Sequence, residues 1–245
     1  MDPGTLLFAA LSTTVVAGTS AVAYLGSELR LRRILRRAPR WSLASLPEDT
    51  LGRVTGAAYP FEGEQLTAPL TGRPCVCFIA IVEQRGRRGG NRARWSRLAI
   101  ERRSVPFVIE DGGHRAVVDP RRARITINFD HMDWSERLPL PVRKPEAPRV
   151  GGTSGIMTQS ERQAQFLDAH HLVNRDWSSL IELRYREAVI EVGEKIAVLG
   201  SGIREPDHEA RPDGNAYRAM GGTRLRLTGS RRYPLVISDD PSTLA

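Results

Sequence analysis

The chain has 245 residues, of which 40% are hydrophobic and 26% are charged, and its formal net charge is +8. This length and apolar content suffice for one large domain or two small ones with a real core. The basic excess is nearly all arginine. It excludes neither an anionic lipid surface nor nucleic acid as a partner, and an arginine-rich genome would produce it as well.

Residues 5–25 (TLLFAALSTTVVAGTSAVAYL) form an apolar run without one ionisable side chain. As a helix, the run would be roughly 32 Å long, which matches the hydrocarbon core of a bilayer. An arginine cluster follows, with Glu28 as its only acid: Arg30, Arg32, Arg33, Arg36, Arg37 and Arg40. Because basic residues flank the cytoplasmic end of a span, the sequence predicts a single membrane span with the N-terminus outside and the following domain cytoplasmic.

Three other interpretations of residues 5–25 are less favoured. A cleaved signal peptide would begin with basic residues, whereas residues 1–4 (MDPG) contain an acid and no base. A core helix of a soluble domain is rarely so long and uncharged, although several serine and threonine residues weaken the hydrophobicity of this run. A helix on the membrane surface would need a charged face, and this run has none.

The predicted organisation has five parts along the chain. These are a short N-terminus, a transmembrane helix, a basic juxtamembrane linker, a β-rich domain and a C-terminal tail, at residues 1–4, 5–26, 27–45, 46–238 and 239–245. Trp41, at the end of the arginine cluster, stands at a depth that suits the membrane interface.

Short apolar runs punctuated by glycine and proline predict the strands in the first half of the domain. They are expected at residues 52–58, 66–70, 75–84, 95–103, 106–111, 114–118 and 123–129. Residues 75–84 (CVCFIAIVEQ) are apolar on both faces, which indicates a central strand. Gly112 and Gly113 suit a tight turn between two strands, and residues 85–94 (RGRRGGNRAR) suit an exposed hairpin loop.

One helix is expected in the second half, at residues 159–171, with Thr158 or Ser160 as its N-cap. The remaining strands, of which the first two should form a hairpin, are expected at residues 183–190, 195–199, 225–227 and 235–237. The whole pattern predicts a mainly β fold, an antiparallel barrel or sandwich of a kind that includes OB-like barrels, with a helical insertion.

Cys75 and Cys77 are two residues apart in a predicted strand. Both side chains should therefore face the same side of the strand and cannot form a disulfide with each other. Their place in an apolar strand favours packing, as free thiols in a reducing compartment, over a nucleophile or half of a metal site.

No other group of residues predicts a catalytic, cofactor or metal site. Residues 130–133 (DHMD) lack a second cluster at a fixed spacing, so a solvated turn is favoured. His170 and His171 end the predicted helix, where cationic side chains ordinarily interact with the helix dipole. Residues 151–155 (GGTSG) contain neither the lysine of a phosphate-binding loop nor the pattern of a nucleophile elbow.

The arginine-rich segment of residues 85–103 permits three interpretations: a solvated loop, a contact with anionic lipid headgroups, or a grip on single-stranded nucleic acid that also uses Trp95. The solvated loop is the simplest of them, and lipid contact is favoured over nucleic acid. The predicted residues for contact with a membrane surface or another anionic partner are Arg30, Arg32, Arg33, Arg36, Arg37, Arg85, Arg87, Arg88, Arg92 and Arg94.

Five pieces of sequence occur in the order of a known family: PLTGRPCVCFIAIVEQ, a tryptophan after a basic loop, VPFVIEDGGHRAVVDPRRA, RYREAVIEVGEKIAVLGSG and RYPLVISD. Together they resemble the GIDE-type or "beside-a-membrane" (BAM) domain of the mitochondrial outer-membrane ubiquitin ligase and of many prokaryotic membrane proteins. The resemblance covers residues 46–238. It implies a domain next to a membrane, and in the ligase a C-terminal RING domain performs the chemistry.

We do not expect the ligase chemistry in this chain. A RING domain holds two zinc ions through eight cysteine or histidine ligands in paired spacings, and this chain has two cysteines, outside any C-x-x-C pair. Only SDDPSTLA follows Ile237, so the second span of the ligase is not expected either. We expect a non-enzymatic binding, sensing or scaffold module without a cofactor, with the lipid bilayer and a further protein as partners. The alternatives are a ligase-like or other transferase activity and a membrane-tethered nucleic-acid-binding module.

Overall fold

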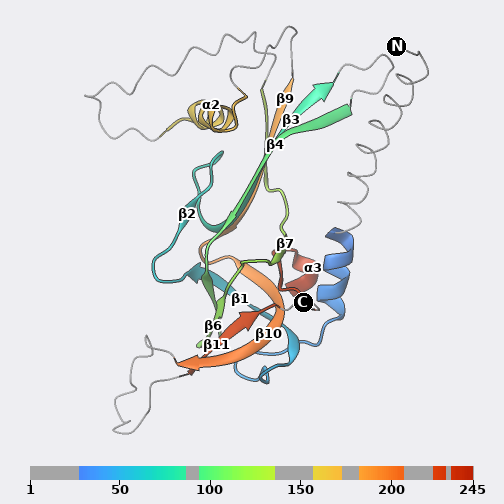
Figure 1. The fold of residues 1–245 in the computed structure, drawn as a ribbon, viewed down its shortest axis with the longest axis vertical. Coiled ribbons are helices and arrows are strands. Elements are labelled where there is room, and N and C mark those ends of the chain that lie inside the picture. Colours follow the sequence, from blue (N-terminus) through green and yellow to red (C-terminus); the bar gives the residue numbers. More distant parts are fainter. Residues whose placement is uncertain are drawn as a thin grey trace, which may run out of the picture.

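The computed structural model describes residues 28–86, 94–135, 157–172, 182–206, 223–229 and 233–244. These residues form two β-sheets with short helices, and Figure 1 shows the sheets one above the other along the long axis. The expected mainly β architecture is confirmed. The predicted span at residues 5–25 lies outside the described residues, and within them no helix has the length and apolar character needed to cross a membrane.

Five strands close into a barrel at the lower end of Figure 1. In order around the barrel they are β1 (Leu51–Pro60), β5 (Phe107–Asp111), β6 (His114–Val118), β11 (Thr223–Thr228) and β10 (Lys195–Pro206). The ring closes because β1 pairs with β10 through its first part and with β5 through its second. Strands β6 and β11 run parallel, and β12 (Val236–Ser238) and β7 (Arg124–Thr126) extend the sheet beside β10.

Gly56 lies where β1 changes from one neighbour to the other. The next residue, Ala57, is paired both with Lys195 of β10 and with Glu110 of β5. A Cβ atom on Gly56 would lie 2.8 Å from the backbone oxygen of Glu110. Only glycine therefore allows β5 to approach β1 this closely, and this approach closes the barrel around its apolar core.

The second sheet packs against the same hydrophobic core as the barrel. Its strands, in order across the sheet, are β4 (Arg94–Ser104), β3 (Pro74–Gly86), β9 (Leu183–Glu191) and β8 (His131–Ser135), and β2 (Leu66–Thr67) pairs with the start of β3. Strand β3 is central, as its continuous apolar sequence predicts. Ile79 and Ile81 of β3 pack in the same hydrophobic cluster as the barrel residues Val54 and Ile109.

Helix α2 (Gln159–Ala169) covers one face of the second sheet. Its Phe166 and Leu167 are buried in one cluster with Phe78 of β3 and Tyr185 of β9. The helix begins with a capping box, in which the Thr158 hydroxyl accepts from the backbone N–H of Glu161 and the Glu161 carboxylate accepts from the backbone N–H of Thr158. The expected helix and its Thr158 N-cap are confirmed.

The predicted hairpin of residues 183–190 and 195–199 is wrong, although both strands exist. Strand β9 pairs with β3 and β8 in the second sheet, whereas β10 pairs with β1, β11 and β12 in the barrel. Gly193 (φ 86°) supplies a tight turn, but its N–H donates to Ala58 of β1 and the carbonyl of Glu194 accepts from Ala58. The turn is therefore held by a third strand and passes the chain from one sheet to the other.

The expectation that Cys75 and Cys77 face the same side is also wrong. The pairing of β3 with β9 shifts in register between these two residues, because a β-bulge adds Val76. As a result Cys75 lies in the cluster under α2, while Cys77 lies in the barrel core.

Residues 28–37, within the expected juxtamembrane linker, form a helix along the side of the barrel (Figure 1). Leu31 and Leu35 are its buried residues, and they pack against β10 and β12. Trp41, which we expect at the membrane interface, packs instead against the barrel core. The chain between Glu28 and the barrel is therefore part of the folded domain.

Candidate functional site

The helix of residues 28–37 presents four of the ten predicted arginines to solvent. It buries Leu31 and Leu35 on one side, and its exposed arginines are Arg30, Arg33, Arg36 and Arg37. Leu29 is 65% exposed and Ile34 is 43% exposed on the same helix. This surface therefore combines positive charge with apolar side chains.

Arg32 differs from the other arginines of this helix because it binds the domain. Its Nη1 lies 2.5 Å from Oδ2 of Asp240, and its Nη2 donates to Oδ1 of Asn128 at 2.8 Å. The backbone N–H of Asn128 donates in turn to the carboxylate of Asp239. Arg32 thus holds the helix on the domain by polar contacts, in addition to the apolar contacts of Leu31 and Leu35.

Two arginines of the second predicted group, Arg85 and Arg94, belong to the strands at the rim of the second sheet, where β3 ends and β4 begins. Arg85 is half exposed and forms an ion pair of 2.7 Å with Glu182. Arg87, Arg88 and Arg92 lie outside the described residues. Arg94 is the first residue of β4, and its side chain is likewise outside them.

Three residues at the same rim form a contact that the sequence did not predict, and we call them the Trp–Arg cluster: Trp95 of β4, Trp134 of β8 and Arg184 of β9. The two indole rings meet edge to face, with their centroids 5.3 Å apart. The guanidinium carbon of Arg184 lies 4.4 Å from the ring centroid of Trp95 and 5.6 Å from that of Trp134. Contacts of this cation–π type contribute about 0.5–1 kcal/mol each at exposed sites.

The Trp–Arg cluster extends across the whole width of the sheet. Trp95 and Trp134 lie on β4 and β8, which β3 and β9 separate, and four adjacent strands span about 14 Å. The two side chains therefore reach toward each other over the inner strands, with Arg184 beneath them. Glu83 of β3 fixes the guanidinium of Arg184 through an ion pair of 2.6 Å.

The cluster lies on the face of the sheet opposite to α2. Leu183 and Tyr185 are buried in the cluster under α2, and Arg184 and Arg186 alternate with them, so they point to the other face. Arg186 lies with its guanidinium carbon 4.0 Å from the ring centroid of Phe129. Trp134 is 45% exposed and its neighbour Met132 is 49% exposed, so this face presents aromatic and apolar surface to solvent.

Residues 130–133, expected as a solvated turn, instead lead into β8 and hold the second sheet together. Nη2 of Arg73 donates to Asp130 at 2.9 Å, and Asp133 accepts from Gln159 of α2 at 2.9 Å. His170 ends α2 with its Nε2 3.2 Å from Oε2 of Glu101. No group of three or more potential metal ligands occurs among the described residues.

Both cysteines are buried, which agrees with the packing role that their sequence context predicts. Burial raises the pKa of Cys75 to about 12, and burial raises the pKa of Cys77 still further. We therefore expect neither thiol to react with Ellman's reagent at about pH 8, where an exposed thiol reacts readily. Both should react once the protein is unfolded in guanidinium chloride, and rapid labelling of the folded protein would contradict the buried placement.

The described residues thus define a β-barrel domain with an attached second sheet. A family model described as GIDE, E3 ubiquitin ligase, matches residues 80–213, more than half of the chain. The chain belongs to this family, as the order of its sequence pieces predicts. The matched region includes all three residues of the Trp–Arg cluster. Searches of curated proteins and of solved structures returned no match.

Proposed function

We propose that the protein is a GIDE-family domain held beside a membrane by one N-terminal span, with the N-terminus outside and the domain on the cytoplasmic side. There it acts as a non-enzymatic binding, sensing or scaffold module. One observation carries the proposal: the uncharged run of residues 5–25 ends just before the helix of residues 28–37. This helix packs on the domain through Leu31 and Leu35. Because the helix that follows the proposed span is packed on the domain, we expect the anchor to fix the orientation of the domain relative to the membrane.

The exposed arginines of this helix support a position close to anionic headgroups. In a span that continues into this helix, at about 1.5 Å per residue, Arg30 and Arg33 would lie roughly 8–12 Å beyond Leu25, and Arg36 and Arg37 roughly 17–18 Å beyond it. The Debye length is about 8 Å at physiological salt. We therefore expect the first two to contribute most, at about 1 kcal/mol each where they reach the surface.

A ligase-like or other transferase activity is the alternative that the family description raises. A thiol-based transferase requires a thiolate, but burial raises the pKa of both thiols of this chain. The binding module predicts that Cys75→Ser and Cys77→Ser leave its interactions unchanged. Loss of a turnover activity in these variants, with folding intact, would favour the enzyme.

Nucleic-acid binding is the second alternative. We infer that the closed five-stranded ring is OB-like, an architecture in which the second and third barrel strands carry ligands. On the corresponding strands β5 and β6, Glu110 and Arg115 pair at 2.7 Å, and Glu205 of β10 pairs with Arg224 and Arg226 of β11 at 2.7 and 2.6 Å. Carboxylates beside these arginines weaken the attraction to a phosphate backbone, and this disfavours the nucleic-acid alternative.

Membrane extraction of cells that express the protein tests the proposed anchor. We expect the full chain to stay in the membrane pellet after an alkaline carbonate wash, because burial of the span in hydrocarbon does not depend on charge. A variant that lacks residues 2–26 should move to the supernatant. Release of the full chain by carbonate would contradict the span.

Protease digestion of sealed vesicles tests the orientation. The domain should be digested in inside-out vesicles and protected in right-side-out vesicles, because the arginines follow the span. The reverse pattern would place the domain outside.

A further inference from the structure

We propose that the outer edge of β4 binds an extended acidic segment of a partner protein, which joins the second sheet as an added strand. In strand addition, main-chain hydrogen bonds supply the affinity, and the side chains that alternate along the edge supply the specificity. The inference rests on the proposed function, since it names the class of partner for the binding module. It requires neither the membrane span nor a particular orientation of the domain toward the bilayer.

Strand β4 offers a long edge for such pairing. It has 11 residues and pairs with β3 along one side, and among the described residues no strand pairs with its other side. At about 3.4 Å per residue, this outer edge is roughly 35 Å long. An unpaired edge presents a row of backbone N–H and C=O groups on which another chain can pair. Strand β8, at the opposite edge of the sheet, has five residues.

A β-bulge places two arginines of β4 on the same face of the sheet. The register between β3 and β4 shifts at Leu98, so that Arg97 lies opposite Glu83 and Arg102 lies opposite Ile79. Without the extra residue, the odd spacing of these arginines would send them to opposite faces. Ile100 is half-buried and lies between them on this face, which is the face of the Trp–Arg cluster. The edge therefore presents a basic, an apolar and a basic side chain in succession.

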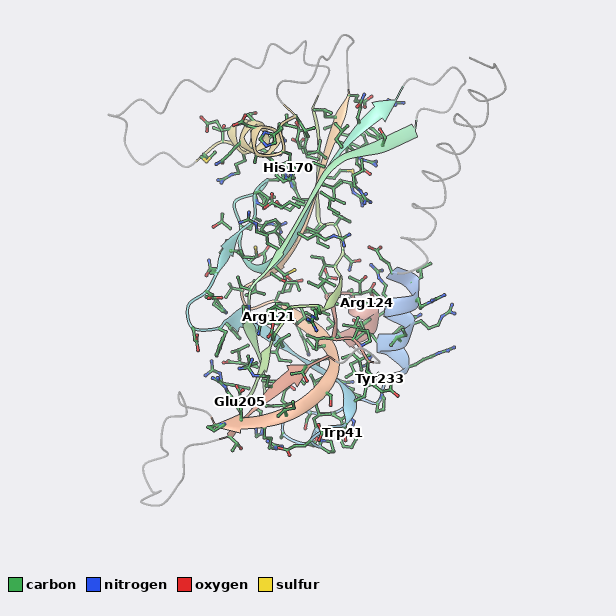
Figure 2. The ribbon with its side chains drawn as sticks, viewed as in Figure 1. Trp41, Arg121, Arg124, His170, Glu205 and Tyr233 are labelled. Atoms are coloured by element: carbon green, nitrogen blue, oxygen red, sulfur yellow. The ribbon has the colours of Figure 1, made fainter. Side chains whose placement is uncertain are left out.

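An acidic strand complements this order of side chains. Side chains directly opposite each other on paired strands share a face, so the matching sequence is carboxylate–x–apolar–x–carboxylate. Arg97 and Arg102 are both exposed. Glu101, the one acidic residue of β4, lies on the other face, where it pairs with Arg103 at 2.9 Å and lies 3.2 Å from Nε2 of His170. Figure 2 labels His170 at the end of α2, which covers that face. The carboxylate of Glu101 is thus directed away from the acidic residues of the added strand.

The same order of side chains disfavours two other occupants. In a pair of β4 strands from two copies of this chain, no carboxylate would lie opposite the arginines on this face, and like charges opposite each other are unfavourable. Charged side chains on an edge ordinarily prevent such self-association, and arginines do not hinder an acidic strand. A nucleic acid could contact the arginines, but its phosphates cannot pair with the carbonyl oxygens that alternate with the N–H groups along the edge.

Binding of labelled peptides to the full-length protein in mild detergent tests the proposal, with fluorescence polarisation as the readout. The probe is the peptide Glu-Thr-Val-Thr-Glu-Thr-Val-Thr-Glu, which carries the proposed pattern on one face. We expect this peptide to bind, and we expect two matched peptides not to bind at the same concentration. One has lysine in place of glutamate. The other is methylated on all its backbone nitrogens, so it keeps the glutamates but loses the main-chain donors.

Two variants with the same change of charge locate the contact. Arg97→Glu should weaken binding of the glutamate peptide about fivefold or more, because it replaces an attraction by a repulsion. Arg204→Glu is the matched control and should leave the affinity within about twofold. Arg204 is exposed and is next to Glu205, which Figure 2 labels at the barrel end of the molecule. Amide hydrogen exchange in β4 should also slow when the peptide binds, whereas exchange in β8 should not change.

Several results would overturn the proposal. Equal binding of the glutamate peptide and its methylated form would exclude strand addition, and equal weakening in both variants would show attraction to the net charge alone. An oligonucleotide that binds, or copies that cross-link through β4, without binding of the glutamate peptide would also overturn it. None of these results affects the proposed anchor, which the carbonate wash tests separately. Protein that carbonate releases but that binds the peptide as expected would overturn only the anchor.

Discussion

Replacement of Glu187 by alanine is expected to lower the free energy of unfolding by about 3 kcal/mol or more. Glu187 lies in β9 and is fully buried. One carboxylate oxygen accepts from the backbone N–H of Leu70 at 2.8 Å, and the other accepts from the backbone N–H of Thr71 at 3.0 Å and from its hydroxyl. Alanine would leave these donors without an acceptor, and each buried unsatisfied donor costs about 1–3 kcal/mol.

Chemical unfolding in mild detergent, followed by tryptophan fluorescence, measures this loss. Glu187→Gln keeps one acceptor oxygen, so we expect a smaller loss than with alanine. Glu64→Ala is the matched control, since Glu64 is exposed and its replacement should change stability by less than about 0.5 kcal/mol. Equal stability of the Glu187→Ala and Glu64→Ala variants would show that Glu187 does not hold the turn before β3.

Replacement of Gly56 by valine is expected to cost about 3 kcal/mol and to loosen the closure of the barrel. The first added carbon atom would already lie 2.8 Å from the backbone oxygen of Glu110. Because this neighbour is backbone and not the end of a flexible side chain, β1 and β5 must separate to accept the change. Strand β5 should then exchange its amide hydrogens faster than β10 does.

Unfolding by urea together with hydrogen exchange measures both effects of the Gly56→Val change. The control is Ala57→Val, an equally sized apolar product at the adjacent position, where the residue is only half buried. We expect it to change stability by less than about 0.5 kcal/mol. If both variants unfold at the same urea concentration, the close approach at Gly56 is not what closes the barrel.

Local sequence patterns located most elements of the fold. The run of residues 75–84 is apolar on both faces and is the centre of β3, and Thr158 stands where a capping box requires it. Both features can be predicted from a single segment of the sequence, because the apolar pattern of a strand and the cap of a helix involve residues only a few positions apart. Strand β8 (HMDWS) was not predicted, although Met132 and Trp134 alternate with polar residues as in a strand, because residues 130–133 were interpreted as a solvated turn.

Contacts between segments that are distant in the chain could not be predicted from such local patterns. Nothing near Gly193 indicates that β9 and β10 enter different sheets, because a tight turn of this length also suits a hairpin. Trp95 and Trp134 lie on β4 and β8, so their contact depends on the order in which distant strands pair in the second sheet. The buried acceptor role of Glu187 likewise depends on the turn at Leu70, more than a hundred residues earlier.

Four features could be found from the sequence alone: the uncharged run of residues 5–25 with its following arginines, the positions of most strands, the helix after Thr158, and the membership in the GIDE family. These are properties of residues close together in the chain or of their order along it. The three-dimensional structure was needed to show which strands close the barrel, that Arg32 binds the domain while Arg30 and Arg33 face solvent, and that two tryptophans meet over Arg184. Strand pairing and side-chain burial are decided by the packing of the whole domain, and one segment of the chain does not contain that information.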